Sequence, residues 1–598
     1  MIDPKSKRSE VPEEFTWDLK GLFESDEAWM AEYEALKELP AQIAAFRGRL
    51  GESAETLLEY FRESDKASLR LEALFGYASL KNDEDNGNAV YQDLRGKAMG
   101  CWVAIAGAAA FATPEIMAID EDSLNLFYIA QPELETYRRP IEEIRRRRAH
   151  ILSPEEEKLL AAAGEMAAAP EKIGSVFRNA DLTYPDVEDG KGEKHALTAG
   201  SYGPLMESGD RVLRRNAFET LYGRVDEFKN TAAATLDAQF KQLCFFSRAR
   251  RYGSTLEASL DGSEIPVEVY TKLVEAVHGN LDKMHRYVAL RKKLLGVDEL
   301  HMYDVYAPIV ADADRKIPFD EAKATVLEAL AVLGEDYTAK LREGFDSRWI
   351  DVYENAGKCG GAYCSGSARP HPYVLLNHKD TLDSMFTLAH EMGHALHSCY
   401  SAENQPVCTS NYRLFVAEVA STCNEVLLVR HLLGKTTDNK ERAALINHFL
   451  ESFKGTVFRQ TMFAEFELTM GKMAEAGETL TAGALCEKYL ELNRLYFGPD
   501  MVSDPQIALE WARIPHFFYD YYVYQYATGF SAAVAIANRI LTGGEAAVAD
   551  YKKFLSGGSS ADPISLLKIA GVDMSGPAPV NSALQLFDEL LDEMEKLA

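Results

Sequence analysis

Two histidines and a glutamate within residues 387–394 have the types and spacing of a metal-dependent hydrolytic centre. The stretch reads TLAHEMGH, which places His390 and His394 four residues apart with Glu391 beside the first of them. Because residues four apart lie on one face of a helix, both imidazoles can reach the same ion. Glu391 could then act on a water bound to that ion. Two imidazoles, a carboxylate from elsewhere and an open water position describe a catalytic zinc site.

This motif requires a helix, and the surrounding residues predict one. Apolar residues from Leu382 to Leu396 recur with the 3.6-residue period of a helix, and Asp380 or Thr381 can cap its start. The alternative is a half-buried helix whose histidines only satisfy hydrogen bonds. The glutamate placed between two correctly spaced histidines disfavours that alternative.

A second helix can supply the third ligand. Residues 414–425 are helical in pattern and mostly apolar, yet they carry Glu418 and Glu425 seven residues apart on one face. Packed against the first helix, this segment could deliver Glu418 to the metal, and Glu425 would orient a histidine. Exposed acids are the alternative, which the apolar neighbours disfavour. The extended motif HExxHxxGxxH fails, because His397 and Tyr400 stand where it needs glycine and histidine. We expect His397 to make local hydrogen bonds.

Three short strands are predicted immediately before the metal-binding helix, at residues 349–353, 360–365 and 372–377. An exposed edge strand can pair with the backbone of an extended peptide. Gly360 and Gly361 would allow a close approach, and together with Ala362 they are our candidates for substrate binding. An ordinary structural hairpin is the alternative.

An aromatic stretch lies more than a hundred residues further on. Five tyrosines and one histidine occur within residues 516–526. Tyr519, Tyr522 and Tyr526 share one face of the helix expected here, and their hydroxyls need partners if they are buried. Hydroxyl donors suit the oxyanion that forms when an activated water attacks an amide. An aromatic core stripe is the alternative.

The chain is too long for one hydrophobic core. It has 598 residues, and helical patterns follow one another from about residue 15 to 200, so the fold class is mainly α with two or more lobes. A hairpin is expected at residues 182–200. We therefore expect an N-terminal helical lobe at residues 1–200 and a catalytic region at residues 201–598.

The net charge, the cysteines and the apolar segments indicate which partners and which compartment to expect. Sixty-four basic and 93 acidic residues give a net charge of −29, which argues against nucleic acid as the main partner. Eight cysteines without a CxxC pair suit reduced thiols in a cytosol. The N-terminus lacks the apolar region of a signal peptide, and the longest apolar run, residues 101–113, is too short to span a bilayer. We expect that run to form a buried helix, and the protein to be cytoplasmic without a membrane partner.

Taken together, these motifs resemble oligoendopeptidase F, of the thimet oligopeptidase family of zinc metallopeptidases. The resemblance spans roughly residues 200–590 and rests on these segments: 360–364, 375–377, the helix that carries HEMGH, 418–421, 516–529 and 554–574. One departure is His378, where relatives often carry tyrosine.

The resemblance implies one zinc ion per chain, held by His390, His394 and Glu418, with Glu391 as the general base. It also implies two helical lobes around a deep central channel, which admits short unstructured peptides and excludes folded proteins. Family members hold the substrate and its oxyanion with a histidine and tyrosines late in the chain. The best matches here are His516, Tyr519 and Tyr526, with Tyr522 as a further substrate-binding candidate.

The expected reaction is therefore hydrolysis of an internal peptide bond in a short oligopeptide. One alternative is a zinc exopeptidase, which removes terminal residues. The other is a catalytically silent peptide-binding scaffold that has kept a structural metal, against which the intact Glu391 argues.

Overall fold

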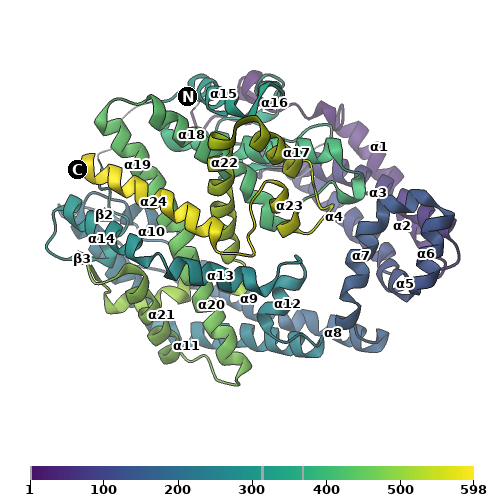
Figure 1. The fold of residues 1–598 in the computed structure, drawn as a ribbon, viewed down its shortest axis with the longest axis horizontal. Coiled ribbons are helices and arrows are strands. Elements are labelled where there is room, and N and C mark those ends of the chain that lie inside the picture. Colours follow the sequence, from purple (N-terminus) through teal and green to yellow (C-terminus); the bar gives the residue numbers. More distant parts are fainter. Residues whose placement is uncertain (1–2, 311–315, 366–368, 598) are drawn as a thin grey trace. The chain divides into compact units, whose positions relative to one another are not determined.

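The computed structural model describes residues 3–310, 316–365 and 369–597, and helices dominate these residues as expected (Figure 1). The chain divides into two compact units, each assembled from separate stretches. Unit 1 comprises residues 1–149, 314–431 and 536–571, and unit 2 comprises residues 150–313, 432–535 and 572–598. Neither unit begins or ends at residue 200, so the division into residues 1–200 and 201–598 stays a prediction.

Unit 1 contains the N-terminal helices and the helix with the HExxH motif. Its helices are α1 (Asp26–Leu36), α2 (Leu39–Ala44), α3 (Ala54–Glu84), α4 (Ala89–Ala109), α5 (Ala112–Ala118), α6 (Glu121–Ala130), α7 (Arg138–Arg146), α15 (Phe319–Ala329), α16 (Glu335–Asp346), α17 (Leu382–Asn404) and α23 (Pro563–Ile569). Ser53 caps α3 by accepting a hydrogen bond from the Thr56 amide. Apolar side chains of α1 to α7, including Trp29 and Leu74, form a continuous core.

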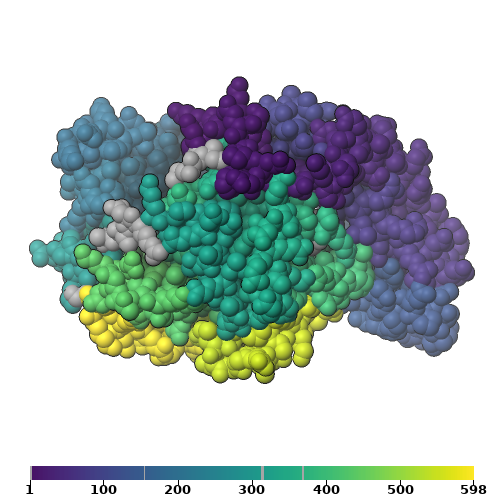
Figure 2. All heavy atoms as spheres, turned by 90° about the horizontal axis from the view of Figure 1, so that it is seen from above, coloured from purple at the N-terminus to yellow at the C-terminus, as the bar shows by residue number. Residues whose placement is uncertain are grey.

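The N-terminal segment is tied to the part of unit 1 that precedes the motif. The Asp18 amide donates to the Arg348 carbonyl, and the Val352 amide donates to the Phe15 carbonyl. Figure 2 shows the N-terminal part of the chain, in dark purple, lying against teal residues, and the hydrogen bonds join it to residues 348 and 352, which follow α16. The first residues of the chain therefore help to hold the small sheet.

That sheet has three strands of two residues each: β4 (Ile350–Asp351), β5 (Tyr363–Cys364) and β6 (Val374–Leu375). The order is β4-β6-β5, with β4 parallel and β5 antiparallel to β6. Leu375 is paired with Asp351 on one side and with Tyr363 on the other. The three predicted strands are therefore confirmed, and β5 lies at an edge.

Unit 2 is also helical. Its helices are α8 (Pro154–Ala167), α9 (Ala169–Val176), α10 (Tyr202–Met206), α11 (Arg211–Ala249), α12 (Thr255–Asp261), α13 (Val267–His278), α14 (Leu281–Leu295), α19 (Asn439–Phe453), α20 (Arg459–Glu475), α21 (Ala482–Phe497) and α24 (Ala578–Leu597). Strands β1 (Val187–Glu188) and β2 (Lys194–His195) form the expected hairpin, and β3 (Leu300–His301) pairs with β7 (Met501–Val502) in parallel. Two helices, α18 (Leu414–Lys435) and α22 (Tyr524–Leu555), contribute residues to both units.

The expectation of a buried helix at residues 101–113 is only partly right. Helix α4 ends at Ala109; it buries Cys101 and Ile105 but exposes Trp102 and Val103. The apolar residues of α4 therefore continue around to an exposed face, where Trp102 keeps a ring contact with Phe75 of α3. The segment Ala89–Ala118 has the length and composition of a membrane span, and 33% of its most apolar 18-residue stretch is buried inside the protein.

Candidate active site

Helix α17 presents the HExxH motif as the sequence predicts. Thr381 caps the helix, and its hydroxyl accepts a hydrogen bond from the Ser384 amide. The side chains of His390 and His394 emerge one turn apart, with 3.2 Å between their Nε2 atoms. Both imidazoles can therefore reach one point in space.

Helix α18 packs unusually close to α17 at a glycine. A Cβ atom added to Gly393 would lie 2.6 Å from Ser421 Cα and 2.8 Å from the Ala420 carbonyl oxygen. Three residues after Ser421 on α18, the side-chain amide of Asn424 donates to the Ala389 carbonyl at 3.1 Å, and the Tyr337 hydroxyl donates to Asn424 Oδ1. The glycine permits the close approach, and Asn424 holds it.

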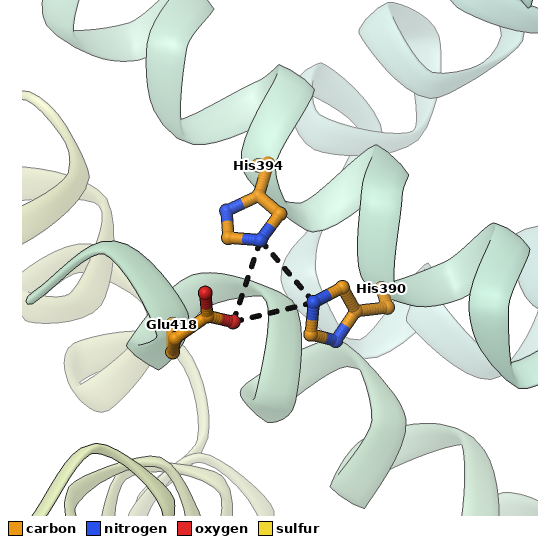
Figure 3. Close-up of side chains that lie close together, drawn as sticks. All are labelled: His390, His394 and Glu418. Atoms are coloured by element: carbon orange, nitrogen blue, oxygen red, sulfur yellow. Dashed lines mark hydrogen bonds and ion pairs between the residues drawn. The ribbon is translucent and has the colours of Figure 1, made fainter. Parts of the chain in front are cut away.

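This approach brings Glu418 to the two histidines (Figure 3). Glu418 Oε2 lies 3.3 Å from His390 Nε2 and 3.5 Å from His394 Nε2. The Ser421 hydroxyl lies 3.2 Å from the same carboxylate oxygen. The three residues form a group whose ligand atoms all lie within 4.8 Å of one another.

Glu425 approaches from one face of α18 and holds the first histidine. Its Oε1 lies 2.5 Å from His390 Nδ1, the nitrogen that points away from Glu418. Burial opposes protonation of His390, but hydrogen bonds with Glu418 and Glu425 outweigh burial and raise its pKa to about 10. The histidine pair thus sits in a strongly negative environment.

Glu391 is the third acid at this position. Its side chain is only 6% exposed, and its Oε2 has no hydrogen-bond partner among the described residues. Burial raises the pKa of Glu391, and electrostatic interactions with His390 and His394 oppose that shift. A buried carboxylate oxygen without a partner is costly, so its retention here points to a ligand or a reaction.

A cavity of about 370 Å³ opens onto these residues. Glu391 and the three clustered residues line one part of it, and the segment from Ala362 to Ser365 lines another. Ser398 and Tyr412 complete the wall. Tyr412 was not predicted from the sequence, because it lies in the loop before α18 and no spacing rule marks it.

Part of the candidate substrate-binding segment, residues 360–362, lines this cavity and a neighbouring one. Ala362 lines both this cavity and a neighbouring one of about 290 Å³, which Gly361 and Asn377 also line. The Asn377 amide donates to the carbonyls of Gly361 and Cys359 and so fixes the loop before β5. Gly361 has a φ of +81°, which favours glycine, whereas Gly360 lines neither cavity.

His397 lies outside the metal-binding group. Its ring is buried and stacks on Tyr412 with 3.7 Å between centroids. Burial is the main reason that its pKa falls to about 3. Its Nδ1 has no hydrogen-bond partner in the described part of the chain, so its observed role is to pack against Tyr412.

The aromatic stretch belongs to unit 2, and its local structure differs from the prediction. The helix α22 begins only at Tyr524, and Pro515–Phe518 form a 3₁₀ turn, so Tyr519 and Tyr522 precede the helix that carries Tyr526. The expectation that the three tyrosines share one helix face is therefore wrong. Their rings nevertheless gather around His516, with centroids 5.6, 6.2 and 5.9 Å from its ring.

The donor set on α17 and α18 fits a zinc ion. Two imidazole nitrogens and one carboxylate oxygen are common zinc ligands, and three protein ligands leave a position for water. Glu425 fixes His390 through Nδ1, which leaves Nε2 for the metal. The unpaired oxygen of Glu391 lies in the same cavity.

Comparison with known proteins identifies the family of this chain. The family model described as Peptidase family M3 matches residues 204–586, and the model described as Oligopeptidase F matches residues 115–184. Oligopeptidase PepF of Bacillus subtilis (strain 168) is 48% identical over 590 residues, covering 99% of this chain and 88% of that protein. An oligoendopeptidase F homolog of Lactococcus lactis is 42% identical and covers 99% of this chain and 98% of that protein.

A solved structure extends the likeness to the fold. The crystal structure of oligoendopeptidase-F from Enterococcus faecium has a TM-score of 0.75 and 39% identity, covering 96% of this chain and 99% of that one. Fold and sequence thus define the class, which is that of mainly helical peptidases. The chain belongs to peptidase family M3, and its resemblance to oligoendopeptidase F is confirmed.

Proposed function

We propose that this protein is a zinc-dependent endopeptidase that hydrolyses internal bonds of short, unstructured oligopeptides. The observation that carries the proposal is the convergence of His390, His394 and Glu418 beside the buried Glu391, in a cavity bordered by an edge strand. One zinc ion per chain would be held by Nε2 of each histidine and by the Glu418 carboxylate. When bound, zinc lowers the pKa of a coordinated water and polarises a carbonyl group.

Glu391 is the proton carrier of this mechanism. Its carboxylate takes a proton from the attacking water and passes that proton to the nitrogen of the leaving amine. The unpaired Oε2 in the cavity supports this role, since it is available to a water molecule. Glu425 keeps His390 oriented through the bond to Nδ1, and it does not itself meet the substrate.

The peptide would bind in an extended form along β5. An edge strand offers backbone donors and acceptors to an extended peptide of any sequence. Ala362, which lines both cavities, and the adjoining Gly360 and Gly361 would border the peptide. A Cβ atom added at either glycine would have no atom within 4 Å, so the backbone is open to a peptide there.

The aromatic group of unit 2 would complete the chemistry. We propose that Tyr519 and Tyr526 donate hydroxyl hydrogen bonds to the oxyanion, with His516 beside them and Tyr522 contacting the peptide. Tyr526 is already oriented toward His516, with 3.4 Å between its hydroxyl and Nε2. Hydroxyl donors aimed at a developing oxyanion are among the largest contributions to catalysis.

A quenched-fluorescence peptide blocked at both ends tests this function. We expect cleavage at an internal bond, loss of cleavage after chelation, and recovery when zinc is added back. Cleavage only of peptides with a free terminus would favour the exopeptidase alternative. Peptide binding without any cleavage by the zinc-loaded protein would favour the silent scaffold.

The same proposal assigns the protein to the cytoplasm. All eight cysteines are free thiols, which suits a reducing compartment. Short peptides released by other proteases occur there, and the net charge of −29 keeps the protein away from nucleic acid. Detection of the activity in a cytosolic fraction would test this location.

A further inference from the structure

Two consecutive residues in the aromatic loop have a backbone conformation that side chains disfavour. Asp520 has a φ of +53° and Tyr521 a φ of +62°, and both lie in the left-handed region. Such a value is uncommon for a residue with a Cβ atom and is an outlier for a bulky one. Two in succession persist only when the surrounding structure holds them. We call residues 519–522 the left-handed turn.

Two helices hold the first half of this turn. The Gln239 side-chain amide, on α11, donates to Asp520 Oδ1 at 2.9 Å. The Ser259 hydroxyl, on α12, donates to the Asp520 carbonyl oxygen. The aspartate is therefore bound through both its side chain and its backbone.

Helix α20 holds the second half. The Tyr521 amide donates to Glu467 Oε1 at 2.6 Å. One turn further along α20, Gly471 makes room for the phenol, because a Cβ atom there would lie 1.8 Å from the Tyr521 hydroxyl. That hydroxyl is paired with Thr255 Oγ1 at 2.7 Å. Glu467 thus binds the backbone amide of Tyr521, and Gly471 leaves space for its ring.

The turn separates the aromatic residues and redirects the chain between them. Tyr521 points inward and is buried, whereas Tyr519 is 49% exposed. The rings of Tyr519 and Tyr522 have 6.5 Å between their centroids and both lie next to His516. If the turn relaxed to ordinary backbone angles, Tyr519 and Tyr522 would change direction relative to each other.

Burial of the Glu467 carboxyl group at this position destabilises the folded state. Its side chain is fully buried, and its second oxygen has no hydrogen-bond partner among the described residues. Burial is the main reason that its pKa is raised well above the usual value. Burying a carboxyl group destabilises the fold unless hydrogen bonds compensate, and among the described residues the hydrogen bond that Glu467 accepts comes from the turn.

We propose that Glu467 is a positioning residue for the reaction: through the Tyr521 amide it maintains the left-handed turn that aims Tyr519 and Tyr522. This inference rests on the proposed peptidase function, in which those tyrosines meet the peptide and its oxyanion. Glu467 itself does not touch the substrate. The acceptor oxygen matters and the charge does not, so glutamine can replace the glutamate.

Three variants test the proposal in the full-length, zinc-loaded protein. Glu467→Leu removes the acceptor, Gly471→Ala fills the space that the Tyr521 phenol occupies, and Glu467→Gln keeps the acceptor. With a blocked fluorogenic peptide, the first two should raise KM and lower kcat, so that kcat/KM falls by ~10- to 100-fold, as expected for groups misplaced by about 1 Å. Glu467→Gln should stay close to the wild type.

Hydrogen exchange gives a readout that does not depend on activity. The backbone amide of Tyr521 should be protected in the wild type and in Glu467→Gln, and should exchange faster in Glu467→Leu. Glu451→Leu is the matched control, because Glu451 is a carboxylate in the same unit that pairs with Arg291 and does not contact the turn. It should lower the melting temperature and leave KM and the exchange of residues 519–526 unchanged.

The outcomes separate this proposal from the proposed function. If the wild type cleaves peptide and Glu467→Leu keeps its KM, its kcat and its protected amide, the positioning role is overturned and the peptidase function stands. If Glu467→Gln is as defective as Glu467→Leu, the charge matters and the proposal is also overturned. A wild type that cleaves no peptide overturns the proposed function, and slow exchange in Glu467→Leu would then show that Glu467 does not hold the turn either.

Discussion

Gly393 and Ser421 bring the two helices of the active site together. The backbone of Ser421 occupies the space that a side chain at position 393 would need, with 2.6 Å between Ser421 Cα and the position of the missing Cβ. Glu418 lies one turn before Ser421 on the same helix, so its distance to the histidines depends on this approach. The glycine inside the motif therefore has a structural reason, beyond the metal ligands themselves.

Replacing Gly393 with alanine should separate the helices. The added methyl group would meet backbone atoms, which cannot rotate away, and we expect a loss of ~1–3 kcal/mol in the free energy of unfolding. Zinc affinity should fall as well, because Glu418 moves. Thermal unfolding and a zinc competition assay would measure both effects. Gly100→Ala on α4 is the control, since nothing lies within 4 Å of its added Cβ; an unchanged zinc affinity in Gly393→Ala would contradict the argument.

Glu391→Gln should keep zinc and lose turnover. The amide has the shape of the carboxylate but cannot accept the proton of the attacking water, so we expect a fall of ~10²- to 10⁴-fold in kcat. Peptide cleavage and atomic absorption on the same sample would check this. Glu403→Gln, near the end of the same helix, is the control and should be fully active. Full activity in Glu391→Gln would remove Glu391 from the mechanism.

Glu418 and Glu425 should affect the metal differently. Glu418→Ala removes one of three proposed ligands, so zinc should be lost on dialysis. Glu425→Gln removes only the partner of His390 Nδ1, and the zinc dissociation constant should rise by ~10- to 100-fold, as for other groups that orient a ligand. Titration against a chelating dye would measure both. Unchanged zinc stoichiometry in Glu418→Ala would point to another ligand.

Tyr519→Phe and Tyr526→Phe should lower kcat without loss of zinc. Loss of one oxyanion donor costs on the order of 10²–10³ in kcat where that donor acts in the transition state. Steady-state kinetics on the zinc-loaded variants would measure it. Tyr524→Phe is the control from the same stretch, since Tyr524 is buried in the core. If neither variant changes kcat, these tyrosines only pack against one another.

A buried ion cluster in unit 2 should govern part of the acid stability. Glu510 accepts hydrogen bonds from Arg459 and Arg513, both at 2.6 Å. Burial opposes the charged carboxylate, but the two arginines outweigh burial and lower the pKa of Glu510 to about 2. Because the folded pKa lies below the unfolded value, this stabilisation, of about 3 kcal/mol, is present above pH ~4.5 and is lost as the pH falls toward 2.

Glu510→Gln tests that cluster. It leaves two arginines without a carboxylate, so the free energy of unfolding should fall by ~3–5 kcal/mol at pH 7. The difference from the wild type should shrink steadily as the pH falls from about 4.5 toward 2, because the wild type then loses the same charge. Urea unfolding at several pH values would show it. Glu268→Gln, at an exposed position of α13, should have no such effect; a difference that stays constant with pH would refute the assignment.

The sequence alone was enough to identify the local chemistry. The spacing of His390 and His394, the cap at Thr381 and the paired acids on the following helix are short-range patterns, and helix geometry converts such patterns directly into shared faces. The three strands before α17 were also recognisable from composition. For the same reason Glu418 could be predicted as the third candidate metal ligand. The distance of 3.3 Å between its Oε2 and His390 Nε2 depends on the packing of α17 against α18.

Only the tertiary structure decided the features that depend on distant contacts. No local pattern shows that Asp520 and Tyr521 adopt left-handed angles, because Gln239, Ser259, Thr255 and Glu467 hold them from three separate helices. For that reason the prediction that Tyr519, Tyr522 and Tyr526 share one helix face was wrong, although their rings do lie around His516. The same holds for Tyr412 in the cavity wall and for the units built from separate stretches of chain. The spacing of residues in the sequence predicts which side chains share one face of a helix. The packing between helices decides which distant residues contact that face.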